Sequence, residues 1–346
     1  MLQLRARDYG IVVGELPAGG RNKITDVPGI TVGHYTVDTD EHKTGVTLLL
    51  PCPENPFTHK LPAAAFVLNG FGKSLGLVQV EELGTLETPI ALTNTLNVGL
   101  VHDALVEYMV SRCEAEGLEL RSVNPVVCEC NDGGLNHIQK RAVGQEAVFA
   151  AFASAGPDFD EGDVGAGKGM VCHGLKGGIG SSSRKMEIEG SVYTMGALVL
   201  ANHGSMKDLT IGGQFIGPRL DEAKAARESD IGSCIVLLAT DLPLDSRQLS
   251  RVAKRASVGL ARLGSFIGQG SGEIFLAFST ANPFNGKEES AFRQTTAFHE
   301  DKLDLPFRAA AECVEEAVLN CLFTARTCTG WDGKTVWGLT ELWKPE

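Results

Sequence analysis

The chain has 346 residues, of which 43% are hydrophobic and 21% are charged, a composition typical of a globular protein with a substantial buried core. Its formal net charge is −12, which argues against nucleic acid and anionic membrane surfaces as partners, because both attract basic proteins. No apolar run reaches the length of a bilayer, and the charged N-terminal residues do not resemble a signal peptide.

Cysteine and glycine usage narrow the class of protein further. The nine cysteines are odd in number, have no framework spacing and stand mostly in apolar runs, as buried free thiols of a reducing compartment do. We therefore expect a cytoplasmic protein. The 41 glycines are not periodic, but they cluster at residues 162–180 and 264–272, where tight turns are expected. Without a repeat or a low-complexity linker, we expect one domain over residues 1–346.

The first half of the chain shows alternating helix and strand patterns. Helices are expected over about residues 72–84, 98–116 and 143–154, and short buried strands over residues 89–93 and 125–128.

The second half is richer in strand patterns. Strands are expected over residues 190–201, 234–239 and 272–279, a helix capped by Ser246 over 246–263, and a final helix over about 306–322. Residues 205–231 are polar and give no clear pattern. Mixed strands and helices of this kind indicate two layers of sheet covered by helices.

Ser233 is the first candidate for chemistry because of its position. It follows Gly232 at the junction between a polar loop and a buried strand. If the backbone is strained there, the serine oxygen can attack the preceding carbonyl and split the chain. The new α-amine, with a pKa of about 8, could then serve as the general base of Ser233. On spacing alone, an ordinary serine at a strand start is the simpler interpretation, and Cys234 is interpreted as a core thiol.

Three further residues stand at strand ends. Ser271 and Glu273 are two positions apart at the start of a strand, so both side chains can face one neighbouring site. A carboxylate there could hold an ammonium group. Asn202 ends an apolar strand, and its amide could donate to a developing oxyanion. Taken singly, a glutamate at a sheet rim and an asparagine in a turn are common structural features.

The glycine-rich segment gives two competing interpretations. Residues 162–168 match the first seven positions of a phosphate-binding loop, but Gly169 stands where the Mg²⁺-binding Ser or Thr belongs, so nucleotide binding is rejected. Lys176, fixed among glycines, could instead supply a cation to an oxyanion. Neither Cys128 and Cys130 nor Cys172 and His173 have paired zinc spacing, and no catalytic metal or other cofactor is expected.

Several segments together resemble one known family, the L-aminopeptidase/D-esterase/amidase group, which includes the β-peptidyl aminopeptidases and is related to the nylon-oligomer hydrolases. The matching segments are residues 22–34, 76–84 with 88–95, 129–136, 165–170 with 176–184, and 232–244. They occur in order and cover nearly the whole chain.

The resemblance implies a four-layer αββα sandwich with two stacked mixed sheets. It also implies that the chain cleaves itself between Gly232 and Ser233, into an α polypeptide 1–232 and a β polypeptide 233–346, which assemble as a homo-oligomer of processed units.

Roles for individual residues follow from the same resemblance. Ser233 matches the family nucleophile, Ser271 and Glu273 its serine and acidic partners, and Asn202 its oxyanion-stabilising asparagine. Lys176 falls where the nylon-oligomer hydrolases place a functional lysine. Some members carry a tyrosine in or beside the segment matched by residues 130–134, and this chain has none there. Asn131 or a backbone N–H is expected to replace it, and Glu129 and Asn131 are expected to bind substrate.

The expected activity is hydrolysis of short N-terminal peptide, amide or ester substrates through an acyl-enzyme on Ser233. Two alternatives remain open from the sequence: acyl transfer of the ornithine acetyltransferase type, and a catalytically silent small-molecule-binding protein on the same fold.

Overall fold

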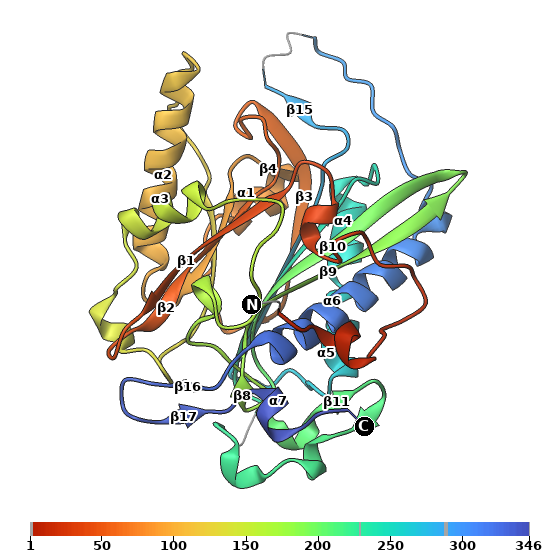
Figure 1. The fold of residues 1–346 in the computed structure, drawn as a ribbon. Helices are drawn as coiled ribbons and strands as arrows, with labels where there is room; N and C mark the ends of the chain where they lie inside the picture. Colours follow the sequence, from red (N-terminus) through yellow and green to blue (C-terminus); the bar gives the residue numbers. More distant parts are fainter. Residues whose placement is uncertain (1–2, 228–229, 287–289, 346) are drawn as a thin grey trace.

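The apolar runs pair into two mixed β-sheets in a computed structural model that describes residues 3–227, 230–286 and 290–345 (Figure 1). The smaller sheet has the strand order β1-β2-β5-β6, and only its β5–β6 pair is parallel. Its strands are β1 (Thr31–Asp38), β2 (Lys43–Leu50), β5 (Ile90–Asn94) and β6 (Val126–Cys130).

The larger sheet has the order β15-β3-β14-β13-β10-β9, with β4 also paired to β3. Only β13 and β14 run parallel to each other. Its strands are β3 (His59–Gly70), β4 (Thr85–Leu86), β9 (Gly178–Ile188), β10 (Ser191–Asn202), β13 (Gly232–Thr240), β14 (Ser271–Ser279) and β15 (Phe284–Asn285).

Apolar side chains from both sheets meet in one buried cluster, which includes Leu49 and Leu92 of the smaller sheet and Leu198 and Leu237 of the larger. Helices cover the outer faces (Figure 1). The smaller sheet packs against α2 (Val98–Ala115) and α3 (Gln145–Ala153), and the larger sheet against α4 (Ser246–Ala253), α5 (Ala256–Arg262) and α6 (Asp304–Thr324). The layers are therefore helix, sheet, sheet and helix, and the expected αββα sandwich is confirmed.

The remaining α-helices and strands are short. They are α1 (Leu77–Leu83), α7 (Leu339–Leu342), and the paired strands β7 (Val171–Cys172) with β8 (Leu175–Lys176), β11 (Thr210–Ile211) with β12 (Gln214–Phe215), and β16 (Cys328–Thr329) with β17 (Thr335–Val336).

Two predicted helices differ from the structure. The pattern over residues 246–263 is split into α4 and α5 at residues 254–255, and the cap is Asp245 rather than Ser246. The Asp245 carboxylate accepts a hydrogen bond from the backbone N–H of Gln248, whose side-chain oxygen accepts one from the backbone N–H of Asp245. The first predicted helix, 72–84, is shortened to α1, which begins after Gly76 with φ of 86° and ends at Gly84.

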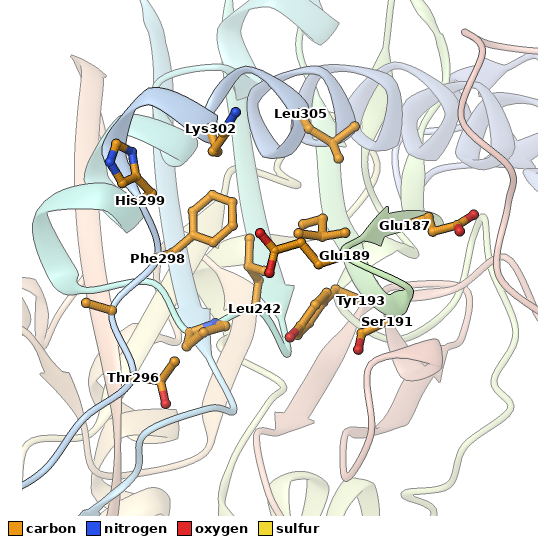
Figure 2. Close-up of a pocket in the computed structure, with 13 residues that line it drawn as sticks. Glu187, Glu189, Ser191, Tyr193, Leu242, Thr296, Phe298, His299, Lys302 and Leu305 are labelled. Atoms are coloured by element: carbon orange, nitrogen blue, oxygen red, sulfur yellow. The ribbon is translucent and has the colours of Figure 1, made fainter.

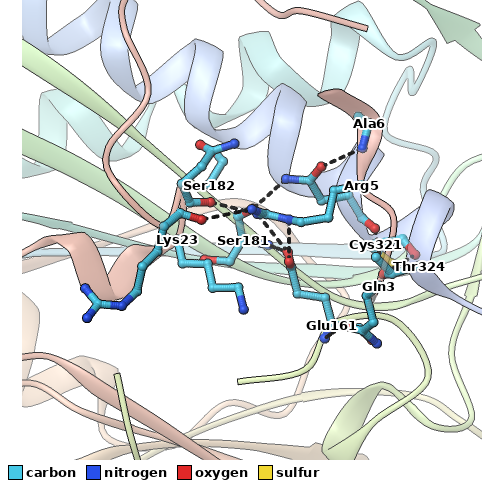
Figure 3. Close-up of polar contacts among 12 residues, drawn as sticks. Gln3, Arg5, Ala6, Lys23, Glu161, Ser181, Ser182, Cys321 and Thr324 are labelled. Atoms are coloured by element: carbon cyan, nitrogen blue, oxygen red, sulfur yellow. Dashed lines mark hydrogen bonds and ion pairs between the residues drawn. The ribbon is translucent and has the colours of Figure 1, made fainter. Parts of the chain in front are cut away.

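The N-terminal segment lies across the edge strand β9 and is fixed by the Arg5 side chain (Figure 3). The guanidinium donates 2.7 Å hydrogen bonds to the carbonyl oxygens of Asn22 and Ser181, and pairs at 2.6 Å with the buried carboxylate of Glu161. Burial raises the pKa of that carboxyl even though Arg5 and Lys23 act to lower it. These contacts tie residues 5, 22, 161 and 181 together.

Candidate active site

Ser233 is the second residue of β13, which lies between β10 and β14 within the larger sheet. The antiparallel register with β10 places Ser233 directly beside Asn202, the last residue of that strand. Side chains alternate along a strand, and Ile235 and Leu237 point into the core between the sheets, so Ser233 faces the smaller sheet as well. The sheet therefore fixes Ser233 next to an amide side chain.

Gly232 is the residue before the candidate nucleophile, and its backbone has φ of 135°, a conformation that favours glycine. A Cβ atom at this position would lie 1.9 Å from the backbone oxygen of Asn202. The carbonyl oxygen of Gly232 accepts a 2.6 Å hydrogen bond from Ser233 Oγ. The serine oxygen thus lies against the peptide unit that the sequence predicts to be cut.

A cavity of about 320 Å³ opens in front of Ser233. Residues from both sheets and from the loop before β13 line it: Phe71, Lys73, Thr95, Glu129, Asn131, Gly134, Asn202, Arg227, Ile231, Gly232, Ser233 and Gly270. A larger cavity of about 690 Å³ lies beside the β9–β10 turn, and Figure 2 shows its Ser191 and His299 on opposite sides. We assign the site to the smaller cavity, because a serine, an amide and a carboxylate converge there.

Three donors and acceptors from separate segments hold the side chain of Asn202. Its Oδ1 accepts hydrogen bonds from the backbone N–H of Val171 at 2.9 Å and from Arg227 Nη2 at 3.0 Å. Both partners can only donate, which fixes the orientation of the amide. Its Nδ2 donates to the backbone oxygen of Asn131 at 3.1 Å, on the side of the cavity.

Arg227 is a member of the site that the sequence analysis missed. Its guanidinium donates to the backbone oxygen of Asn202 at 3.1 Å, to Asn202 Oδ1, and to the backbone oxygen of Ile231. It therefore spans from the end of β10 to the segment just before Gly232. Residues 205–231 gave no pattern in the sequence, so the only available signal was an arginine five positions before Gly232.

Ser271 and Glu273 lie on β14, where the parallel register sets them opposite Gly232 and Cys234. The Ser271 hydroxyl donates to Glu273 Oε1, so the two side chains share a face as the sequence predicts. Among the described residues, Glu273 Oε2 has no hydrogen-bond partner. Burial raises the pKa of this carboxyl to about 7. The pair flanks the backbone of Ser233 but does not line the cavity in front of its hydroxyl.

Comparison with known proteins identifies the family. The model of Peptidase family S58 matches residues 22–336. The chain belongs to Peptidase family S58. It is 37% identical to the β-peptidyl aminopeptidase BapA of Sphingosinicella xenopeptidilytica, over 97% of this chain and 88% of that protein.

Two solved structures are similar to this S58 chain along almost its whole length. The PH0078 protein from Pyrococcus horikoshii OT3 has a TM-score of 0.92 and 46% identity, covering 97% of this chain and 96% of that one. The L-aminopeptidase D-Ala-esterase/amidase from Ochrobactrum anthropi, described as a prototype for the serine aminopeptidases with a variant of the Ntn hydrolase fold, has a TM-score of 0.90 and 36% identity, covering 97% and 95%. This S58 chain is accordingly a peptide hydrolase of the serine aminopeptidase type.

Glu129 gives the cavity of this S58 peptidase a buried carboxylate. Its Oε1 accepts a 2.9 Å hydrogen bond from the backbone N–H of Lys73, and its Oε2 accepts one from the Thr95 hydroxyl. Asn131 also lines the cavity, but its side-chain oxygen accepts from the backbone N–H of Gly133 at 2.9 Å. What Asn131 offers to Asn202 is its backbone oxygen.

Lys176 lies apart from the cavity. Its side chain is fully buried, and Nζ donates to the backbone oxygens of Gly167, Met170 and Gly177 at 2.7–3.0 Å. Burial lowers the pKa of this amine, while Asp163 acts in the opposite direction. Lys176 therefore links three backbone carbonyls of the glycine-rich segment to one another. It does not line the cavity in front of Ser233.

Proposed function

We propose that this peptidase cleaves its own Gly232–Ser233 bond and then hydrolyses the N-terminal residue of short peptides, amides or esters, with Ser233 as nucleophile. The observation that carries this proposal is the hydroxyl of Ser233, at 2.6 Å from the carbonyl oxygen of Gly232 and next to the amide of Asn202. The names of the related β-peptidyl aminopeptidase and L-aminopeptidase support the substrate class.

In the proposed cleavage, Ser233 Oγ attacks the carbonyl carbon of Gly232 and its proton passes to the leaving nitrogen. The C–N bond breaks, and an ester joins Gly232 to the serine oxygen. Water then hydrolyses this ester, which gives polypeptides 1–232 and 233–346. Turnover repeats the same chemistry on a substrate carbonyl, with an acyl-enzyme on Ser233. Asn202 Nδ2 would donate to the oxyanion in each step.

The α-amine freed at Ser233 would be the general base, because its pKa of about 8 lets it accept the hydroxyl proton near neutral pH. Its ammonium form needs an acceptor. Glu273 Oε2, which has no partner among the described residues and lies one strand away, supports the proposal that Glu273 and Ser271 position this amine.

The carboxylate of Glu129 is proposed to bind the α-ammonium of the substrate. It is 2% exposed, lines the cavity and is oriented by Lys73 and Thr95. A buried carboxylate favours a free amino terminus over a blocked one, because an acylated amine brings no charge to pair with it.

Two broader expectations also stay proposals. All nine cysteines are free and buried, which supports a reducing, cytoplasmic location. No helix in the described ranges is long and apolar enough to cross a membrane. Assembly as a homo-oligomer rests on the family resemblance. The acyltransferase and silent-binder alternatives are not favoured by the relatives found.

The deciding experiment is the intact mass of denatured, freshly purified protein. We expect two polypeptides meeting between Gly232 and Ser233 in the wild type and in Cys234→Ala, and one unbroken chain in Ser233→Ala. The processed enzyme should hydrolyse an aminoacyl p-nitroanilide with a free amine and not its N-acetyl form. An unbroken wild-type chain, or cleavage that persists in Ser233→Ala, would refute the proposal.

A further inference from the structure

A cluster of metal-ligating side chains lies behind Asn202, outside the proposed catalytic machinery. Cys172 ends β7, His173 follows it in the turn to β8, and His203 follows the last residue of β10. All three residues are fully buried, with 0% of their surface exposed. One ligand atom from each lies within 4.8 Å of the other two. Thirty residues separate the two segments, so spacing in the sequence did not predict this group.

The two histidines have ring nitrogens without partners among the described residues. His173 Nδ1 lies 3.1 Å from the backbone oxygen of Ser205, so it carries the proton, and Nε2 is left without a hydrogen bond. Within the described parts of the chain, neither ring nitrogen of His203 has a hydrogen-bond partner. Buried polar atoms are almost always satisfied, so three such nitrogens beside a thiol call for a ligand.

The backbone of two segments brings the imidazole of His173 to this cluster. His173 has φ of 49° in the turn between β7 and β8, a left-handed conformation that is uncommon for residues other than glycine. A Cβ at Gly204 would lie 2.5 Å from His173 Nδ1, so the glycine allows the imidazole to pack against the end of β10. With Gly174 at φ of 69°, His173 forms the two-residue turn of the β7–β8 hairpin, and this turn sets the imidazole beside the Cys172 thiol.

We propose that Cys172 Sγ, His173 Nε2 and one ring nitrogen of His203 bind a single Zn²⁺ ion, with water as the fourth ligand. One thiolate and two imidazoles are a ligand set that Zn²⁺ accepts in tetrahedral geometry. Binding converts the Cys172 thiol to a thiolate and releases its proton to solvent. The hydrogen bond from His173 Nδ1 to a backbone carbonyl is the contact that typically orients a metal-bound imidazole.

The distances are compatible with this ion. Zinc–sulfur and zinc–nitrogen bonds of about 2.0–2.3 Å place tetrahedral ligands roughly 3.3–3.8 Å apart. Ligand atoms of the three residues lie within 4.8 Å of one another, so the side chains would move together by no more than about 1.5 Å on binding the ion.

The bound ion would be a structural clamp. It would join the β7–β8 turn to the end of β10. Both segments position Asn202: Val171 of β7 donates its backbone N–H to Asn202 Oδ1, and Asn202 is itself the last residue of β10. The three ligands do not line the cavity of Ser233, so the ion would not touch substrate. The inference goes beyond the proposed function and does not depend on it.

The test uses the full-length protein, stripped of metal by a chelator and then titrated with Zn²⁺ against a chromophoric chelator, and separately with Co²⁺. We expect one equivalent of Zn²⁺ per chain and a thiolate-to-cobalt charge-transfer band. Cys172→Ala should remove the band and weaken Zn²⁺ binding by about 10- to 100-fold or more. His173→Asn, which tolerates the left-handed backbone, should weaken it similarly.

Cys113→Ala is the matched control, since Cys113 is another buried free thiol but lies on α2. It should keep both the stoichiometry and the band. Absence of the band in the wild type, or Zn²⁺ binding that is unchanged in Cys172→Ala, would overturn the proposal whether or not the chain is processed. If a variant fails to fold, the Co²⁺ spectrum of the wild type alone decides.

Discussion

The buried carboxyl of Glu273 predicts how the stability of the uncut chain depends on pH. Its side chain is 0% exposed, and burial raises its pKa from the ordinary 4.5 to about 7. Each unit of pKa difference between the folded and unfolded states corresponds to about 1.4 kcal/mol. A difference of about 2.5 units therefore gives at most about 3.4 kcal/mol.

The sign follows from proton binding. The unfolded chain loses the Glu273 proton near pH 4.5, whereas the folded chain keeps it until about pH 7. Between these values the folded state binds more protons, so its free energy of unfolding falls as the pH rises. The contribution is fully present below about pH 4.5 and is lost by about pH 7.

The assay is urea unfolding at pH 5 and pH 8 of Ser233→Ala, which is expected to stay uncut, beside Ser233→Ala/Glu273→Gln. Glutamine keeps the shape and cannot ionise, so the double variant should lose about 2–3 kcal/mol less stability over this interval. Burial also raises the pKa of Asp132 to about 7, but Asp132 is present in both proteins and its effect cancels. Identical pH dependence in the two proteins would refute the assignment.

Three further predictions concern other parts of the structure. Asn202→Ala should lower kcat of the processed enzyme by about 10²–10³-fold, measured on an aminoacyl p-nitroanilide, because one oxyanion donor is lost; an unchanged kcat would exclude that role. Gly232→Ala should leave the chain unbroken on a denaturing gel, since its Cβ would meet the Asn202 backbone oxygen at 1.9 Å; normal cleavage would contradict this. Arg184→Met should destabilise the chain by about 3–5 kcal/mol in urea unfolding, because Glu312 and Glu316 would lose a fully buried partner at 2.5–3.1 Å; a change below about 1 kcal/mol would argue against it.

The apolar runs were sufficient to predict much of the fold. Strands β10, β13 and β14 and helices α2 and α6 agree with the sequence patterns within a few residues, because each buries a continuous apolar surface. The two-residue break between α4 and α5 was not visible, since the apolar stripe continues through both helices. The pattern predicts which side is buried, but not where the helix is interrupted.

Strand β9 shows why the remaining fold could not be predicted. Its residues Ser181, Ser182 and Arg184 are polar, yet all are fully buried. The Ser182 hydroxyl donates to the backbone oxygen of Cys313 at 2.6 Å, and Arg184 pairs with Glu316 at 2.5 Å, both on α6. A polar strand becomes a core strand only when its partners arrive from more than a hundred residues away, and a local pattern does not contain them.

The same limit applies to the site, and Asn202 illustrates it. A turn asparagine after an apolar strand could be selected from the sequence, but its orientation depends on Val171, Arg227 and Asn131, which come from three other segments. Two donors occupy Oδ1, and the Asn131 backbone oxygen takes one of the two Nδ2 hydrogens. In the proposed mechanism the second hydrogen is the one available to an oxyanion on the carbonyl beside Ser233. The reactivity of that serine would then depend on the loop that carries Arg227 as much as on the sheet that holds it.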